Sequence, residues 1–316
     1  MRFFVTGGAG FVGSHLVERL VADGGEVTVF DNLTSGKKEF IVQHLKLANF
    51  QFIKGELLQL AEIKKAMRGH DVVFHLAANP DVRRGLEKTD LDLKLETFAT
   101  HHLLEAMRQE DVRRIIFASS STVYGEAPQI AVSEDYGPLL PTSLYGAGKL
   151  ACEGLISAFC HVFGMQSWLF RFANIVGKRV THGVIFDFIN KLKLNPGELE
   201  ILGDGRQSKP YLHVSDCVDG MLFGFRKATE RVNLFNLGCD SETRVSDIAR
   251  MLVAEMGLKD VKFRYTGGER GWPGDVPQVR FNVDKMKKLG WQAKFSSDEA
   301  VRQAIKDILG DCECRR

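Results

Sequence analysis

The stretch Thr6-Gly7-Gly8-Ala9-Gly10-Phe11-Val12-Gly13 decides how the first part of this chain folds. It follows the apolar run Phe3-Phe4-Val5 and opens a helical pattern over Phe11 to Val21, so it joins a strand to a helix. The segment contains GxGxxG at Gly8, Gly10 and Gly13, and GxxGxxG starting at Gly7. Such glycines allow a tight turn and let the backbone approach a pyrophosphate at the helix amino terminus. We therefore expect Gly7, Gly10, Phe11, Val12 and Gly13 to bind a dinucleotide.

An acidic residue at the end of the next strand supports this interpretation. Asp31 closes the run Glu26 to Phe30 and lies roughly 20 residues beyond the glycines, where a carboxylate can accept both hydroxyls of an adenosine ribose. A glycine-rich turn followed by a helix-capping Asp is the alternative, which the coincidence of two features makes the weaker one. An Asp without an adjacent Arg repels a 2′-phosphate, so NAD is favoured over NADP, although Lys37 and Lys38 keep NADP open.

Strands alternate with helical patterns through the first half of the chain, which predicts an α/β fold with a doubly wound (Rossmann) parallel sheet covered on both faces. We place the cofactor domain at residues 1–172, with a return segment near 208–240. Residues 173–316 are expected to form mainly a smaller, mixed α/β substrate domain. The expected strands are 3–5, 26–30, 50–53, 71–75, 114–118, 168–171 and 233–237, and the expected helices are 11–21, 97–108, 216–225 and 245–256.

The composition excludes several classes of protein. The 316 residues are 44% hydrophobic and 26% charged, as in globular proteins with a sizeable core and unlike disordered or collagen-like chains. The net charge of +2 gives no support for nucleic-acid binding. No apolar run approaches the ~20 residues that span a bilayer, and we expect no signal peptide, no membrane partner and a cytoplasmic location.

The six cysteines indicate neither a metal site nor a disulfide framework. They are scattered and include no CxxC pair, so buried free thiols are the favoured interpretation and no metal is expected. Cys312 and Cys314 lie near the carboxyl terminus, where a redox or metal role stays open.

Tyr145 and Lys149 are the candidate catalytic pair. Four residues apart at the head of a predicted helix, they share one face. A phenol with a pKa near ~10 is too weak a base at neutral pH, and a neighbouring ammonium lowers that pKa. A YxxxK pair alone is more often an exposed pair of side chains four residues apart on a helix. Here it follows the fifth strand and a serine run at 119–121, and strand carboxyl ends face the ligand crevice of a doubly wound sheet.

With these motifs together, the chain resembles the extended short-chain dehydrogenase/reductase family, and within it the UDP-glucose 4-epimerase-like enzymes. The resemblance covers nearly the whole chain and implies a nucleotide-sugar substrate, NAD and a homodimer. The motifs that carry it are TGGAGFVGSH (6–15), HLAANPDVR (75–83), SSSTVYG (119–125), YGAGK (145–149), RFAN (171–174), GDG (203–205), YLHV (211–214) and RGWPGD (270–275).

The resemblance implies roles for individual residues. Tyr145 would be the base, Lys149 its partner and a ribose ligand, and Ser120 the catalytic hydroxyl. Asn174 would contact the substrate, and the diphosphate would be met by Lys209, where the family usually has Arg, or by Arg270. The remaining expected cofactor contacts are Asn32, Leu76, Ala77 and Ala78.

The chain departs from the family pattern at three positions. Glu56 replaces the Asp that usually contacts adenine, and Glu96 replaces an Asn often found near the nicotinamide ribose. Lys209 keeps a positive charge for a phosphate but lacks the bidentate fork of arginine. These differences bear on affinity and substrate rather than on the class of reaction.

The resemblance also separates the possible reactions. The family's 4,6-dehydratases carry an Asp-Glu pair where this chain has Ser121 and Thr122, and its decarboxylases usually have Glu at the position of Thr122. We therefore expect an NAD-dependent 4-epimerase acting on UDP-glucose and UDP-galactose. A dehydratase, a ketoreductase and a non-catalytic NAD-sensing protein are the alternatives, and non-catalytic relatives commonly lose the Tyr or the Lys.

Val279 is the candidate for setting the size of the sugar pocket. It aligns with a position where some relatives place a bulky Tyr, and Val would leave room for UDP-N-acetylhexosamines. A strand residue that merely packs into the second domain is the competing interpretation.

Overall fold

The computed structural model describes residues 1–127, 131–272, 274 and 276–313, with the backbone alone at 311–313. Some residues named above lie outside the described part of the chain: Pro273, Asp275, Cys314 and the side chain of Cys312.

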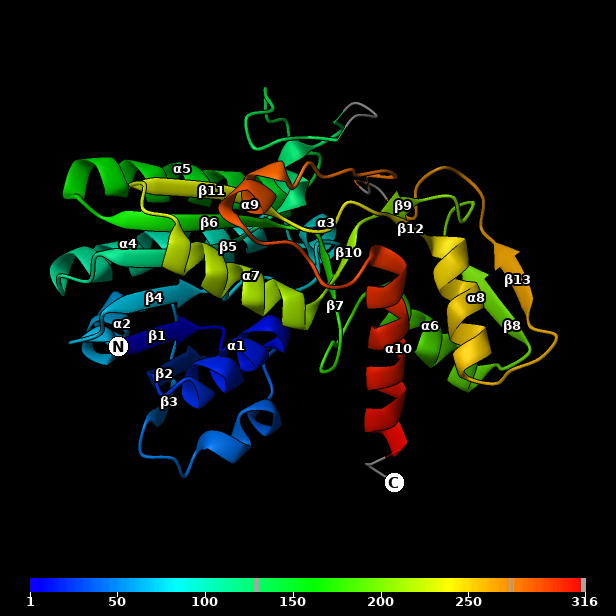
Figure 1. Cartoon of the computed structure of the whole chain (residues 1–316), viewed down its shortest axis with the longest axis horizontal. Coiled ribbons are helices and arrows are strands. Elements are labelled where there is room, and N and C mark those ends of the chain that lie inside the picture. Colours follow the sequence, from blue (N-terminus) through cyan, green and yellow to red (C-terminus); the bar gives the residue numbers. More distant parts are fainter. Residues whose placement is uncertain (128–130, 273, 275, 314–316) are drawn as a thin grey trace.

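A seven-stranded parallel sheet forms the centre of the larger lobe, in the order β11-β6-β5-β4-β1-β2-β3 (Figure 1). The expected doubly wound α/β fold is therefore confirmed. The strands are β1 (Arg2–Thr6), β2 (Glu26–Asp31), β3 (Phe50–Lys54), β4 (Val72–His75), β5 (Arg114–Ser120), β6 (Gln166–Phe172) and β11 (Val232–Leu237).

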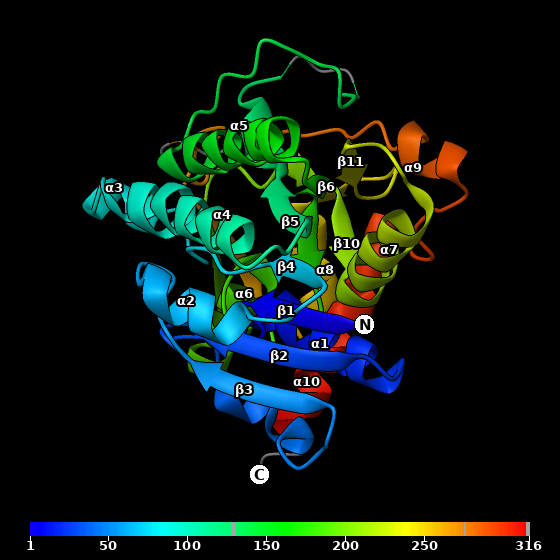
Figure 2. The same cartoon turned by 90° about the vertical axis from the view of Figure 1, so that its left-hand side faces the viewer.

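Helices cover both faces of this sheet, because successive strand residues point to opposite sides. In β1, Phe3 and Val5 belong to one hydrophobic core and Phe4 to the other. Figure 2 shows α1 and α7 on one side, and α2, α4 and α5 on the other. The helices of this lobe are α1 (Phe11–Ala22), α2 (Leu60–Met67), α3 (Arg84–Glu87), α4 (Ala99–Gln109), α5 (Leu144–Phe163), α7 (Val214–Lys227) and α9 (Asp284–Leu289).

Short helical turns complete the larger lobe. They are the 3-10 turns η1 (Lys38–Phe40), η2 (Val42–His44) and η4 (Ser121–Tyr124), and the π-helical turn η3 (Leu93–Phe98) that leads into α4. The helix expected over 97–108 thus begins inside η3 rather than as a regular α-helix, because a π-helical turn has a hydrogen-bond pattern that hydrophobic periodicity does not reveal.

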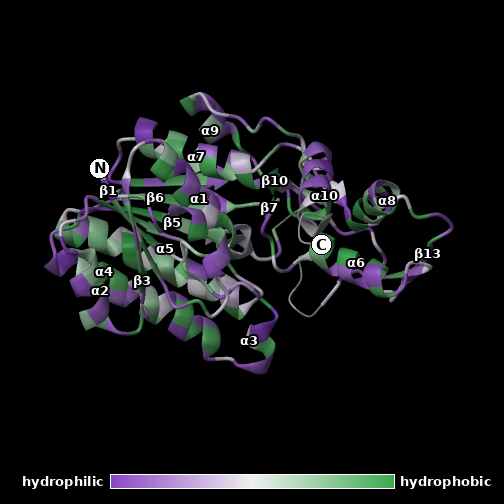
Figure 3. Ribbon diagram, turned by 90° about the horizontal axis from the view of Figure 1, so that it is seen from below, coloured by the Kyte–Doolittle hydropathy of each residue, from purple (hydrophilic) through white to green (hydrophobic). Residues whose placement is uncertain are grey.

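The smaller lobe has a hydrophobic core of its own, formed by α6, α8, α10 and their neighbouring strands. Figure 3 shows these three helices grouped at the end of the molecule away from the main sheet, with both hydrophobic and hydrophilic residues along each helix. Its elements are β7 (Asn174–Val176), α6 (Val184–Leu194), β8 (Glu198–Ile201), β9 (Ser208–Lys209), β10 (Tyr211–His213), β12 (Thr243–Arg244), α8 (Val245–Glu255), β13 (Lys262–Tyr265) and α10 (Ser297–Glu313).

The chain crosses from the smaller lobe back to the larger one. After β10 it forms α7, which packs beside α1, and then β11, which pairs in parallel with β6 at the edge of the sheet. The division of the chain at residues 172 and 173 stays a prediction.

Within the described residues, no helix combines the length and the apolar character needed to cross a membrane. The same residues contain no group of three or more His, Cys, Asp and Glu side chains placed to hold a metal ion.

Candidate active site

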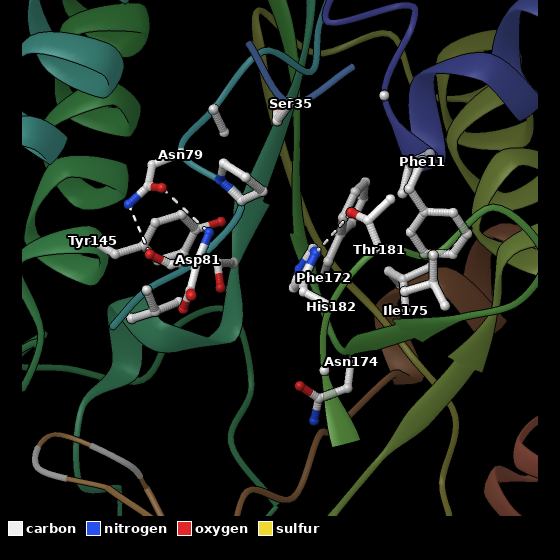
Figure 4. Close-up of a pocket in the computed structure, with 18 of the residues that line it drawn as sticks. Phe11, Ser35, Asn79, Asp81, Tyr145, Phe172, Asn174, Ile175, Thr181 and His182 are labelled. Atoms are coloured by element: carbon white, nitrogen blue, oxygen red, sulfur yellow. Dashed lines mark hydrogen bonds between the residues drawn. The ribbon is translucent and has the colours of Figure 1, made fainter. Parts of the chain in front are cut away.

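A cavity of about 820 Å³ lies where the carboxyl ends of the central strands meet the smaller lobe (Figure 4). This edge of a doubly wound sheet is where ligands bind, because the strand order reverses there and leaves a crevice between the loops. Most of the predicted site residues line it, although they are spread over more than 250 positions of the chain. They are Gly7, Gly10, Phe11, Val12, Gly13, Asp31, Asn32, Leu76, Ala77, Ala78, Ser120, Tyr145, Lys149, Asn174, Lys209 and Val279.

The glycine loop brings three backbone segments closer together than side chains would permit. Gly7 has a φ of +69°, and a Cβ there would lie 2.5 Å from the amide nitrogen of Ala77. A Cβ on Gly13 would lie 2.1 Å from the carbonyl oxygen of Gly7. Gly10 caps α1 and has no side chain to occupy the first N–H groups of the helix. The loop therefore presents backbone donors and a positive helix end to the cavity, as a bound phosphate requires.

Asp31 ends β2 and is held by the backbone on both sides. Its Oδ2 accepts a hydrogen bond from the amide of Ala9 at 3.0 Å, and its Oδ1 accepts one from the amide of Leu33 at 2.8 Å. Burial raises the pKa of the carboxyl, while these two hydrogen bonds lower it. A carboxylate has about four acceptor positions, so two remain for ribose hydroxyls. A Cβ on Gly36 would lie 3.0 Å from both oxygens, so glycine keeps this side of Asp31 open.

Lys37, Asn32 and Glu56 are the neighbours of Asp31 at the expected adenosine end of the cavity. Lys37, which kept NADP open, places its ammonium 5.8 Å from the centre of the Phe40 ring. Asn32 donates from its side-chain amide to Glu56 at 3.0 Å, and both residues line the cavity. Glu56 thus lies beside the position expected for the adenine end of a dinucleotide.

Tyr145 reaches the cavity because α5 approaches the end of β5 closely. Ser143 caps α5 by accepting a hydrogen bond from the amide of Gly146 at 3.1 Å. A Cβ on Gly146 would lie 2.7 Å from the carbonyl oxygen of Thr122, so only glycine lets the helix start so near η4. The first turn of α5 therefore places the phenol beside Ser120, whose hydrogen bond lowers the pKa of Tyr145.

The net pKa of Tyr145 differs from the expectation drawn from the sequence. Burial is the largest influence and raises the pKa to about 12, although Lys149 lowers it as expected. Two buried carboxylates, Glu96 and Asp92, add to the increase. The expectation rested on the ammonium of Lys149 alone, and the difference follows from desolvation and these negative charges.

Lys149 lies one helical turn beyond Tyr145 and is buried. Its Nζ is 5.5 Å from the centre of the Tyr145 ring and 4.8 Å from that of Phe117. It forms an ion pair with Glu96 at 2.9 Å, and the side chains of both residues are at most 2% exposed. Glu96 also accepts a hydrogen bond from the amide of Asn79 at 3.2 Å. The position that sequence analysis marked only as a departure therefore contacts the candidate catalytic lysine directly.

Ser120 is the hydroxyl of the serine run that ends β5 at the cavity. Its Oγ accepts hydrogen bonds from the amide and from the hydroxyl of Thr122, at 3.2 and 3.0 Å. Ser119 is buried and donates to Glu153 at 2.5 Å, so it serves a different network. Ser121 and Thr122 also line the cavity, where the family's dehydratases carry carboxylic acids.

Three of the four further residues expected to contact the substrate line the cavity. Asn174 begins β7, Lys209 ends β9, and Val279 lies on the loop that follows residue 276. Arg270 is the exception. It is absent from the described lining of the cavity, and its guanidinium forms an ion pair with Glu126 on a loop of the larger lobe. The sequence could not reveal this, because Glu126 lies 144 positions away.

Several cavity residues were not assigned a role from the sequence. Asn79 and Asp81 follow β4, and Thr181 and His182 follow β7 (Figure 4). Burial lowers the pKa of His182, which favours its neutral form. The HLAANPDVR motif contained Asn79 and Asp81, but nothing in the pattern of residues 177–183 marked His182 as a ligand-facing group.

Comparisons with known proteins agree with this architecture. The UDP-glucose 4-epimerase of Mycolicibacterium smegmatis is 31% identical over 318 residues, covering 97% of this chain and 98% of that protein. A UDP-N-acetyl-alpha-D-glucosaminuronate decarboxylase of Bacillus cytotoxicus is 30% identical over 324 residues, covering 98% of this chain and 96% of that protein.

Among solved structures, a UDP-galactose 4-epimerase superposes with a TM-score of 0.88 and 39% identity, covering 98% of this chain and 99% of that one. Residues 3–238 match the profile of the NAD dependent epimerase/dehydratase family. This chain belongs to the NAD dependent epimerase/dehydratase family.

Proposed function

We propose that the protein is an NAD-dependent nucleotide-sugar 4-epimerase that interconverts UDP-glucose and UDP-galactose. The observation that carries the proposal is the meeting of Tyr145, Lys149 and Ser120 with the glycine loop in one cavity, without an acid at Ser121 or Thr122. Epimerisation needs a base that can also return a proton, whereas elimination of water needs an additional acid.

The residues of the cavity fit NAD. Gly7, Gly13 and Gly36 leave space that a Cβ would fill, beside backbone donors and the Asp31 carboxylate. These groups would hold the pyrophosphate and the adenosine ribose, and Lys149 has three donors, of which one bonds Glu96. When bound, NAD supplies an acceptor for the C4 hydride of the sugar and returns it.

In the proposed mechanism, Tyr145 removes the proton from the sugar O4 and Ser120 orients that hydroxyl. The positive charge of Lys149 stabilises the phenolate that takes part in this step. The 4-keto sugar then turns its other face, and Tyr145 gives the proton back to O4 with C4 inverted. Asn174 and Lys209 would anchor the nucleotide diphosphate during this rotation.

The alternative reactions are less well supported by the acids available. Asp81 is a carboxyl that lines the cavity, and it forms an ion pair with Arg83 at 3.1 Å. Burial raises the pKa of Asp81, but the hydrogen bonds and charge of Arg83 outweigh burial, and the net pKa is below its usual value. A carboxylate that stays ionised is a poor proton donor for dehydration.

The test is to incubate the purified protein with NAD and, in separate reactions, UDP-glucose, UDP-galactose, UDP-glucuronate or dTDP-glucose, and to resolve the products by chromatography. We expect UDP-glucose and UDP-galactose to reach the same mixture from either side, with no net NADH. A pentose with carbon dioxide, or a 4-keto-6-deoxy sugar, would replace the proposal by a decarboxylase or a dehydratase. No product from any sugar, with NAD still bound, would favour the non-catalytic alternative.

Three further properties are proposals. A homodimer and, through Val279, acceptance of UDP-N-acetylhexosamines rest on the family resemblance, whereas a cytoplasmic location rests on the sequence alone. Val279 lines the cavity, lies outside the named strands and packs against a hydrophobic core of the larger lobe.

A further inference from the structure

Glu96 is a buried acid in contact with the candidate catalytic lysine, at a position where the family resemblance implies a neutral asparagine. Its Oε2 lies 2.9 Å from Lys149 Nζ, and its side chain is 1% exposed. The backbone around it permits this approach, because Gly148 faces Glu96 and a Cβ there would lie 3.1 Å from the glutamate Cβ. A buried ion pair costs the desolvation of both charges, and removing one partner leaves an uncompensated buried charge.

Other ionisable groups surround the pair from each neighbouring element. Asp92 precedes η3, and its Oδ1 accepts a hydrogen bond from Asn79 at 2.8 Å, whereas its Oδ2 is buried without a hydrogen-bond partner among the described residues. His75 of β4 and Cys152 of α5 are buried nearby. Burial lowers the pKa of His75 to about 3 and raises that of Cys152 to about 12, so both are neutral between those limits.

The charges near Tyr145 are therefore one ammonium, from Lys149, and up to two carboxylates, from Glu96 and Asp92. Lys149 remains protonated, since the attraction of Glu96 and Tyr145 outweighs burial and raises its pKa. The carboxylates offset the ammonium, and each makes a phenolate at Tyr145 less favourable.

We propose that Glu96 is a positioning residue that holds Lys149 in place and offsets its charge, so that Tyr145 keeps its proton up to a higher pH than beside an unpaired ammonium. This inference rests on the proposed function, because the role of Glu96 presupposes the epimerase reaction. An epimerase uses one phenol first as a base and then as an acid. A phenol that regains its proton readily suits the second of these steps.

The experiment compares Glu96→Gln with the wild type in two ways. The first is the pH dependence of kcat with UDP-glucose on the NAD-loaded enzyme. The second is the ultraviolet absorbance of phenolate, with the titration of Tyr145→Phe subtracted so that the other four of the five tyrosines cancel. Removing a nearby charge of either sign moves a pKa by about one unit. We therefore expect both curves to move to lower pH by about one unit, with about tenfold higher kcat on the acid limb.

Two further variants serve as controls. Glu96→Asp keeps the charge and should leave both curves near those of the wild type. Glu105→Gln removes a partly exposed acid of α4, which is paired with Arg108, and should leave both curves unchanged. A merely structural role for Glu96 would lower the stability of the fold and kcat at every pH without moving either curve.

Several outcomes would overturn the inference. They are unchanged curves in a folded Glu96→Gln protein, or a shift to higher pH, which would mean that Lys149 had lost its charge. If that variant does not fold, Asp92→Asn takes its place. This variant leaves the Glu96–Lys149 ion pair intact and should shift both curves to lower pH by less than Glu96→Gln does. Unchanged curves in Asp92→Asn would count equally against the inference. A phenolate shift in a protein that turns over no nucleotide sugar would support the role of Glu96 and refute the epimerase instead.

Discussion

Replacing Gly13 by alanine tests whether the close approach of α1 to the glycine loop controls cofactor binding. The new Cβ would lie 2.1 Å from the Gly7 carbonyl oxygen and 2.9 Å from both Gly7 C and Gly8 Cα. All three are backbone atoms, so no side-chain rotation can relieve the contact. Restoring even 3.0 Å requires the helix and the loop to separate by about 0.9 Å.

The expected cost follows from two opposing contributions. Alanine favours a helix over glycine by about 1 kcal/mol, whereas overpacking costs about 1–3 kcal/mol and more where backbone must move. A shift of this size also misaligns the donors at the start of α1. We therefore expect a lower free energy of unfolding and a loss of NAD affinity of roughly ten- to a hundredfold, since each 1.4 kcal/mol is a factor of ten.

Gly154→Ala is the matched control, because Gly154 is an exposed glycine inside α5 with nothing within 4 Å of its added Cβ. It should stabilise the protein by about 0.5–1 kcal/mol and leave NAD binding unchanged. Urea unfolding and fluorescence titration with NADH measure both quantities. If Gly13→Ala unfolds and binds NAD like the wild type, the close approach is not a constraint and the reasoning fails.

Three predictions concern specificity and chemistry. Because Asp31 would accept ribose hydroxyls and repel a phosphate, the protein should bind NAD more tightly than NADP, and equal affinities in parallel titrations would point to Lys37 instead. Tyr145→Phe should lower kcat at least a hundredfold while nucleotide-sugar binding persists, and Ser120→Ala should also slow turnover; near-normal rates would assign the proton transfer to another group. Val279→Tyr should reduce turnover of UDP-N-acetylhexosamines more than that of UDP-glucose, and an unchanged ratio would show that Val279 does not set the pocket size.

Local patterns were sufficient to predict the fold and to select candidate cofactor residues that line the cavity. The glycine spacing, the strand that precedes it and Asp31 are close in sequence, and they depend on backbone geometry that neighbouring residues determine. The alternation of strands with helical patterns likewise predicted the parallel sheet, including the late strand over 233–237 that joins it as β11. Tyr145 and Lys149 were recognisable because a helix places positions four apart on one face.

Contacts between distant segments were decided by the tertiary structure alone. Arg270, a second candidate for the diphosphate beside Lys209, pairs with Glu126, because loops of the two lobes meet there. Glu96 is visible in the sequence as a departure from the family pattern, but its ion pair with Lys149 depends on how η3 packs against α5. The pKa of Tyr145 likewise depends on contacts between distant segments. An ammonium four residues away is visible in the sequence, whereas burial and the carboxylates of another element are not, because desolvation and charge act through space rather than along the chain.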